Sequence, residues 1–288
     1  MAFELWYSRL SGNYRKGTTF SEIKKLFVDN LTTKFIYEPL ACCKLGDDPN
    51  TVGQKMEDLD FDVLGVIDND EKIIGYQSLK DLPNDELQPQ NFSLEIVISD
   101  STPLSSLVGL LQSSPYVFIL SENEIVGIVT RADVNKPIFR IYLFSLISLL
   151  EIHLNFWINK FFKNNRWEDI INEGARRTAL NHFNRQQQHN NELTLLECVH
   201  LPAKITILSQ SEDFVNLFRL DQAFFQILHH IPKIRNMLAH NQNSIFEADN
   251  WEQFGRSIKC IPGFLEKSEE NVKEKNNSNH ENLANSES

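Results

Sequence analysis

A seven-residue pattern occurs twice in the first half of the chain. Its copies are Gly75-Tyr-Gln-Ser78-Leu-Lys-Asp81 and Gly127-Ile-Val-Thr130-Arg-Ala-Asp133. Both have a glycine, then a hydroxyl side chain, then an aspartate, and each matching position is 52 residues apart. Each copy follows a two-strand hairpin pattern, 66–74 in the first and 118–126 in the second. One register shared by two such copies indicates an internal repeat of a single structural unit.

The segments around the two copies predict an α/β fold. Short stretches rich in β-branched residues, between Asp, Asn and Gly, predict strands. These strands are expected at Val63–Ile67, Lys72–Tyr76, Leu94–Ile98, Tyr116–Leu120 and Ile125–Val129. Thr102–Leu111 has a proline near its start and an apolar period near four, so it predicts a helix.

After Pro137 the pattern becomes entirely helical. Helical spacing covers Ile138–Phe162, Trp167–Asn184, Leu193–Leu208 and Leu220–Ala239. The last segment, 266–288, is rich in Asn, Ser, Glu and Lys, and we expect it to be disordered. The predicted organisation is an N-terminal arm or helix (1–30), two repeats (31–136, divided into about 31–85 and 92–136), a helical bundle (137–265) and this tail.

The charge of the chain is unevenly distributed. The formal net charge is −11, yet residues 137–265 hold 13 Lys and Arg against 12 Asp and Glu. Arg176, Arg177 and Arg185 lie within one short stretch of this part. The charge of this part therefore allows contact with RNA, although the negative net charge of the whole chain does not indicate a nucleic-acid-binding protein.

Composition favours a cytoplasmic protein that does not enter a membrane. The first residues lack a basic patch followed by an apolar stretch, so no secretory signal is visible. The most apolar window, Ile141–Leu150, is half the length needed to cross a bilayer. The four cysteines have neither zinc-ligand spacing nor a secreted disulfide framework, so we expect reduced, partly buried thiols.

The repeated hydroxyl and aspartate have two readings. Ser78 and Thr130 lie where a hydroxyl can cap a helix, whose free N–H groups would then face an anion. Asp81 and Asp133 fall in the first helical turn, where a carboxylate can accept from a ribose diol. The alternative is a capping box, in which the aspartate only closes the helix end.

These motifs resemble the CBS domain family, whose members pair two β-α-β-β-α repeats. The resemblance implies that the paired clefts bind an adenine nucleotide (AMP, ADP or ATP) as a regulatory ligand. It places Thr130 and Asp133, and Ser78 and Asp81, at the phosphate and ribose. The second copy matches the family more closely than the first, where Tyr76 and Gln77 replace the usual aliphatic pair, so one site is expected rather than two. A purely structural pair that dimerises the protein is the alternative.

A second motif, Arg235-Asn236-Met-Leu-Ala-His240, occurs in the helical part. On an ideal helix Arg235 and His240 would point about 140° apart, so they converge only if the helix ends near Ala239. Asn236 lies four residues before His240 and could fix its tautomer. The alternative is a histidine favoured by the dipole at a helix C-terminus.

This half of the chain resembles the HEPN superfamily of helical bundles, many of which are metal-independent endoribonucleases that act as dimers. The resemblance implies that His240 moves protons, that Arg235 stabilises the phosphate and that Asn236 supports them. It also makes Glu151, the one acid in an apolar first helix, a candidate partner of Arg235. The alternative for Glu151 is a solvent-facing or salt-bridged acid. No cluster of Asp, Glu or His with ligand spacing suggests a metal.

Together the resemblances imply a homodimeric, nucleotide-regulated endoribonuclease that needs no catalytic cofactor. RNA would be its substrate, and stress response and phage defence would both suit it. One rival is a non-catalytic module that only dimerises or recruits a partner. The other rival is a cytosolic regulator of a transporter or channel.

Overall fold

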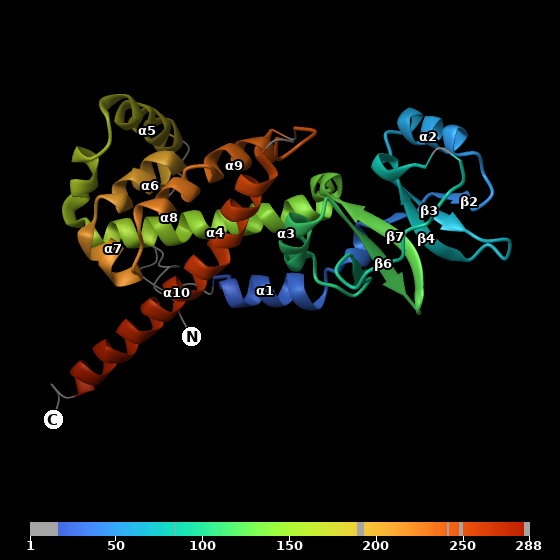
Figure 1. The fold of residues 1–288 in the computed structure, drawn as a ribbon. Coiled ribbons are helices and arrows are strands. Elements are labelled where there is room, and N and C mark those ends of the chain that lie inside the picture. The colour runs from blue at the N-terminus through green and yellow to red at the C-terminus, as the bar shows by residue number, and fades with distance from the viewer. Residues whose placement is uncertain (1–16, 84, 189–192, 241, 248–249, 285–288) are drawn as a thin grey trace. The chain divides into compact units, whose positions relative to one another are not determined.

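The computed structural model describes residues 17–83, 85–188, 193–240, 242–247 and 250–284. These residues form two units (Figure 1). One unit, called here the repeat unit, spans Phe27–Phe139. The other, the helical unit, combines the chain up to Leu26 with the chain from Arg140 onward. Most of the predicted N-terminal arm, 1–16, lies outside the described residues.

The repeat unit contains the same element order twice, as the internal repeat predicts. The first copy consists of β2 (Cys42–Lys44), α2 (Pro49–Asp58), β3 (Val63–Ile67), β4 (Ile73–Ser78) and the 3-10 helix η3 (Leu79–Asp81). The second consists of β5 (Val97–Ser99), α3 (Leu104–Ser113), β6 (Tyr116–Ser121), β7 (Glu124–Thr130) and the 3-10 helix η4 (Arg131–Asn135). A short 3-10 turn therefore stands in each copy where an α-helix is expected after the motif.

Each copy builds its own sheet, and the edge of each sheet is completed by a segment that precedes the other copy. The strand orders are β2-β3-β4 and β1-β7-β6-β5, where β1 is Glu38–Pro39. Glu38 pairs with Ile128 of the second copy, whereas Gln90 forms an antiparallel bridge with Tyr76 of the first. Glu38 and Gln90 are 52 residues apart, and so are Tyr76 and Ile128. We call this arrangement the edge exchange.

The first elements of the repeats are the ones that sequence patterns missed. Strand β2 is only three residues long, and helix α2 was not predicted although Asp48 caps it and Pro49 begins it. Strand β5 begins at Val97 rather than at Leu94, whose side chain is 95% exposed. Short strands that contribute two or three paired residues leave little alternation to detect.

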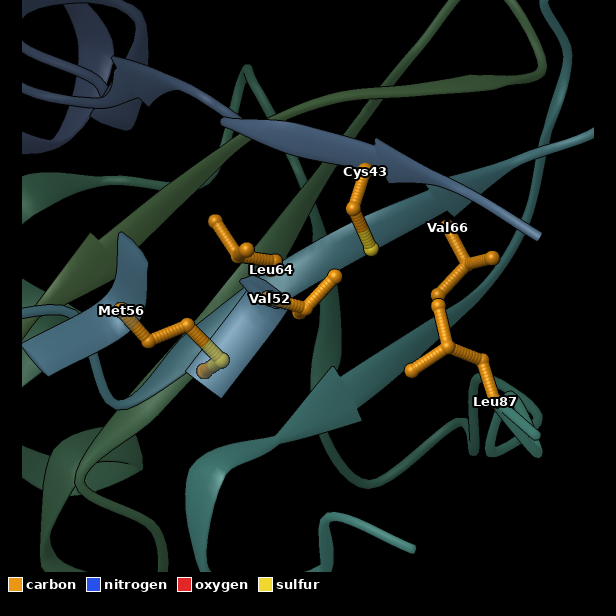
Figure 2. Packing of buried hydrophobic residues seen from close by; sticks show 6 residues of the cluster. All are labelled: Cys43, Val52, Met56, Leu64, Val66 and Leu87. Atoms are coloured by element: carbon orange, nitrogen blue, oxygen red, sulfur yellow. The ribbon is translucent and has the colours of Figure 1, made fainter. Parts of the chain in front are cut away.

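The core of the first copy forms between α2 and the sheet. Figure 2 shows its six side chains: Cys43, Val52, Met56, Leu64, Val66 and Leu87. They come from β2, α2, β3 and the segment after η3, and all are buried. Cys43 contributes as a small apolar residue, and all four cysteines of the chain are free thiols, as expected.

The helical unit consists of α-helices linked by short 3-10 turns (Figure 1). Its elements are α1 (Phe20–Asp29, which runs on into the repeat unit), α4 (Pro137–Phe161), η5 (Lys163–Asp169), α5 (Glu173–Gln187), η6 (Leu196–Cys198), α6 (Leu201–Ser209), α7 (Glu212–Phe218), α8 (Gln222–Leu228), α9 (Ile231–Ala239) and α10 (Trp251–Ala284). The predicted stretches 193–208 and 220–239 are each divided, because Pro202 and Pro232 lie in the first turns of α6 and α9.

The expectation of a disordered tail from Glu266 is wrong for its first residues, because α10 continues through them. Ser268 is fully buried, and its hydroxyl accepts the indole N–H of Trp157 at 2.6 Å and lies 2.6 Å from Nδ1 of His153. Burial lowers the pKa of His153 to about 4. The Glu269 carboxylate is also buried and accepts the backbone N–H of Phe20 at 2.5 Å. The prediction was based on polar composition, but Ser268 and Glu269 are polar residues that make hydrogen bonds inside the protein.

Helix α4 is the only helix among the described residues that is long and apolar enough to cross a membrane. Of its most apolar window, 56% is buried inside the protein. The helix also carries the buried His153 and the ion-paired Glu151. The core helix of a bundle has the same features, so the length and composition of α4 do not show that it spans a membrane.

Candidate functional site

The glycines of the two motifs are explained by the edge exchange. A Cβ on Gly127 would lie 2.6 Å from the carbonyl oxygen of Glu38 and still closer to the ring of Tyr37. A Cβ on Gly75 would lie 2.6 Å from the carbonyl oxygen of Gln90. Real Cβ atoms do not approach oxygen so closely. Each motif glycine therefore allows the exchanged segment to cross its strand.

Thr130 and Asp133 form a capping box at the start of η4. Oδ2 of Asp133 accepts the backbone N–H of Thr130 at 2.6 Å and its hydroxyl at 3.1 Å. Oδ1 of the same carboxylate binds the Lys136 ammonium at 2.8 Å. The aspartate is 6% exposed, so its charge is compensated inside the protein.

Lys136 is the cation that pairs with the aspartate of this second motif. Its ammonium also binds the carboxylate of Glu38 and the carbonyl of Ile36. Burial opposes its charge, but hydrogen bonds to Asp133 and Glu38 outweigh burial and raise the pKa of the ammonium. An ammonium between two carboxylates makes charge-assisted hydrogen bonds of the kind that a phosphate can also accept.

The first motif has a different hydrogen-bond pattern, and its aspartate binds no cation among the described residues. The Ser78 hydroxyl accepts the backbone N–H of Lys80 at 3.3 Å. Oδ2 of Asp81 accepts the side-chain amide of Gln90 at 3.1 Å, and among the described residues no ammonium or guanidinium lies within ion-pair distance of it. Glu38 and Gln90 thus occupy matching places beside the two motif aspartates, one through Lys136 and one directly.

An aromatic cluster fills the space beside the first motif and joins the two sheets. Its members are Tyr76, Phe92, Tyr116 and Phe118, with ring centroids 4.8–6.4 Å apart in the contacting pairs. Burial raises the pKa of the Tyr116 phenol to about 12, and Tyr76 and Asp81 contribute in the same direction. The first motif therefore faces neutral aromatic groups and carboxylates, which suits an anion poorly.

The Arg–His motif lies at the end of α9, which stops at Ala239 as the polar run after it predicts. Arg235, Asn236 and His240 are all exposed. The Arg235 guanidinium lies 3.5 Å from the side-chain oxygen of Asn236, and the backbone N–H of His240 donates to the carbonyl of Asn236 at 2.9 Å. The three residues therefore share one exposed helix end.

Glu151 does not join this motif. Its carboxylate binds the ammonium of Lys204 on α6 at 2.6 Å, which agrees with the salt-bridge alternative. Lys204 is fully buried, and burial lowers the pKa of its ammonium while Glu151 opposes that shift. Arg140, which contacts the end of α9, lies eleven residues earlier on α4, about 16 Å along the helix. This separation explains why Glu151 cannot hold Arg235.

Lys136, Glu38, Gln90 and Lys204 take part in these sites although sequence reasoning did not single them out. For Glu38 and Gln90 the signal was present, because they also follow the 52-residue register. Among the described residues, no group of three or more His, Cys, Asp or Glu side chains is arranged to hold a metal ion.

No protein-family model matches the chain, and no curated protein matches it significantly. Solved structures are similar to its N-terminal part. An uncharacterised conserved protein from Pyrococcus horikoshii is 22% identical with a TM-score of 0.31, covering 36% of this chain and 88% of its own. CBSX2 from Arabidopsis thaliana, solved in complex with AMP, is 19% identical with a TM-score of 0.34, over 38% and 97%. The CBS domains of a transcriptional regulator from Streptococcus pneumoniae are 19% identical with a TM-score of 0.32, over 37% and 98%.

Proposed function

We propose that the repeat unit binds an adenine nucleotide at the second motif and thereby regulates the helical unit. The observation that carries the proposal is the buried Asp133 carboxylate with Lys136 on one oxygen and Thr130 on the other. A ribose hydroxyl that donates to Asp133 takes the place of Lys136. The released ammonium then neutralises the phosphate, which the Thr130 hydroxyl also contacts.

The first motif does not take the same ligand in this proposal. Gln90 already donates to Asp81, and the aromatic cluster occupies the neighbouring space. Among the residues that the structure describes, no cation pairs with Asp81 in the way that Lys136 pairs with Asp133. One nucleotide per chain is therefore the expected stoichiometry.

Titration calorimetry with AMP, ADP and ATP tests this site. We expect Thr130→Ala and Lys136→Gln to weaken binding at least tenfold, because each removes a phosphate contact. The matched variants Ser78→Ala and Asp81→Asn, at the first motif, should bind like the wild type. A ligand at 100 times its dissociation constant should also stabilise the fold by roughly 2.7 kcal/mol. Millimolar nucleotide that neither binds nor raises the melting temperature would contradict the proposal.

For the helical unit we propose a second function, metal-independent cleavage of RNA by a cytoplasmic homodimer. The observation in its favour is the exposure of Arg235, Asn236 and His240 together at one helix end. The RNA 2′-oxygen attacks phosphorus while His240 takes its proton, the bond to the 5′-oxygen breaks, and the protonated His240 imidazole returns a proton to that oxygen. The products are a 2′,3′-cyclic phosphate and a 5′-hydroxyl, and Arg235 stabilises the crowded phosphate.

Regulation of this activity needs a connection between the two motifs along the chain. Helix α4 begins at Pro137, directly after Lys136, and runs on into the helical unit. A ligand that moves Lys136 therefore acts on the first residues of a helix that both units share.

Cleavage of a labelled RNA in the presence of EDTA, with end-group analysis, tests the nuclease. We expect His240→Ala and Arg235→Lys each to lower the rate about 100- to 1,000-fold, as is typical for losing one well-placed transition-state contact. His229→Ala, an exposed histidine nearby in the chain, is the control and should cleave normally. Adding AMP, ADP or ATP to the wild type measures regulation.

Cleavage that survives His240→Ala, or that requires magnesium, would rule the nuclease out. The bundle would then be a dimerising or recruiting module. Capture of a transporter or channel by an inactive protein would favour the regulator instead.

A further inference from the structure

The side chain of Arg140 closes the end of α9. Its Nη2 donates to the carbonyl oxygen of Met237 at 3.2 Å, and its Nη1 donates to that of Gln242 at 2.8 Å. The backbone N–H of Gln242 also donates to the carbonyl of Met237, at 3.1 Å. This last bond is the six-to-one contact that ends a helix in a Schellman motif. The two carbonyls that Arg140 binds therefore flank His240 in the chain.

The imidazole of His240 has no hydrogen bond or ion pair among the described residues. Its place is set by the backbone, through the N–H of His240 that donates to Asn236 and through the N–H of Gln242 that donates to Met237. A proton-transfer group must be held to within a fraction of an ångström of its target to be effective. Catalysis by His240 therefore requires a side chain that holds the C-terminal end of α9 in place.

We propose that Arg140 is a positioning residue for His240, an inference that rests on the proposed RNA cleavage. The last carbonyls of a helix lack partners within the helix, and a cation near them interacts favourably with the helix dipole. The planar fork of a guanidinium reaches two carbonyls at once, whereas an ammonium is a single point charge. Arg140 thus fixes both ends of the short segment that carries His240.

Hydrogen exchange and imidazole NMR test this role in the full chain, with Arg140→Lys and Arg140→Ala. We expect the amides of Leu238, His240 and Gln242 to exchange at least tenfold faster in both variants, and the His240 ring signals to shift. Amides of α6 should keep their wild-type rates, which separates a local change from unfolding. Arg219→Lys is the matched control, because Arg219 is an exposed arginine at the C-terminal end of α7 with no ion pair among the described residues.

RNA cleavage by Arg140→Lys supplies the functional readout. We expect at least a tenfold loss of rate and an altered pH profile, whereas Arg219→Lys should retain both. Wild-type exchange rates in Arg140→Ala would show that Arg140 does not hold the end of α9. A wild-type pH profile in Arg140→Lys would show that Arg140 does not position His240. If the wild-type protein does not cleave RNA, the nuclease proposal fails, while exchange and the ring signals still decide whether Arg140 holds His240.

Discussion

Replacing Gly127 with alanine should destabilise the repeat unit by about 3 kcal/mol, the upper end of the usual range for overpacking. The new Cβ would meet the backbone oxygen of Glu38 at 2.6 Å, and a backbone atom in a paired strand cannot swing away as a flexible side chain can. Relief requires Glu38–Pro39 to leave the edge of β7, which also breaks the contact of Glu38 with Lys136. Such a loss is a large fraction of the stability of an ordinary domain.

Chemical denaturation of the full chain, followed by fluorescence and circular dichroism, measures this effect. Gly75→Ala should behave alike, because its Cβ would meet the carbonyl oxygen of Gln90 at the same 2.6 Å. Gly46→Ala is the matched control in the same unit, since no atom lies within 4 Å of its added Cβ. A loss below about 0.5 kcal/mol for Gly127→Ala, the level of an ordinary surface change, would refute the edge exchange as drawn.

Removing residues 266–288 should abolish cooperative folding of the helical unit. Ser268 satisfies two fully buried polar groups, the indole N–H of Trp157 and the ring nitrogen of His153. Each buried group left without a partner costs roughly 1–3 kcal/mol. The truncation also removes the buried Val272 and the Glu269 carboxylate that binds the backbone of Phe20. The sum is comparable with the whole stability of a domain.

Two variants separate this docking from a general effect of shortening the chain. A chain cut after Glu274 keeps Ser268, Glu269 and Val272, so its melting temperature should stay within a few degrees of the wild type. Ser268→Ala removes the hydroxyl and adds no atom to this buried site, and should cost about 2–4 kcal/mol because two buried groups lose their partner. Near-ultraviolet circular dichroism during heating reports both. Equal melting of the wild type and the chain that lacks residues 266–288 would show that α10 is dispensable beyond Leu265.

The sequence alone was informative wherever a pattern is local. The 52-residue register predicts two copies of one unit, and the hairpins of both copies are found as expected because alternating β-branched residues and turn residues lie next to each other. The end of α9 at Ala239 was predictable for the same reason, from the polar residues that follow it.

Contacts between distant segments were not predictable from single positions. Glu151 has an arginine, Arg235, as an attractive partner in the sequence, yet it binds Lys204, fifty-three residues along the chain. The polar residues of 266–272 read as a solvated tail, because nothing local shows that Trp157 and His153 require a hydroxyl. Asp133 illustrates a third case, since the capping alternative and the ligand-binding reading use the same carboxylate, and the structure shows the cap directly.

The edge exchange makes the two copies unequal during synthesis, although their final geometry is alike. Gln90 closes onto Tyr76 across fourteen residues, whereas Glu38 must find Ile128 across ninety. The longer closure costs about 1.6 kcal/mol more chain entropy by the logarithmic loop-length relation. At roughly 5–20 residues per second, the partner of Glu38 also leaves the ribosome several seconds later. The N-terminal edge segment thus leaves the ribosome before its partner strand, and its pairing with β7 is the later of the two edge contacts to become possible.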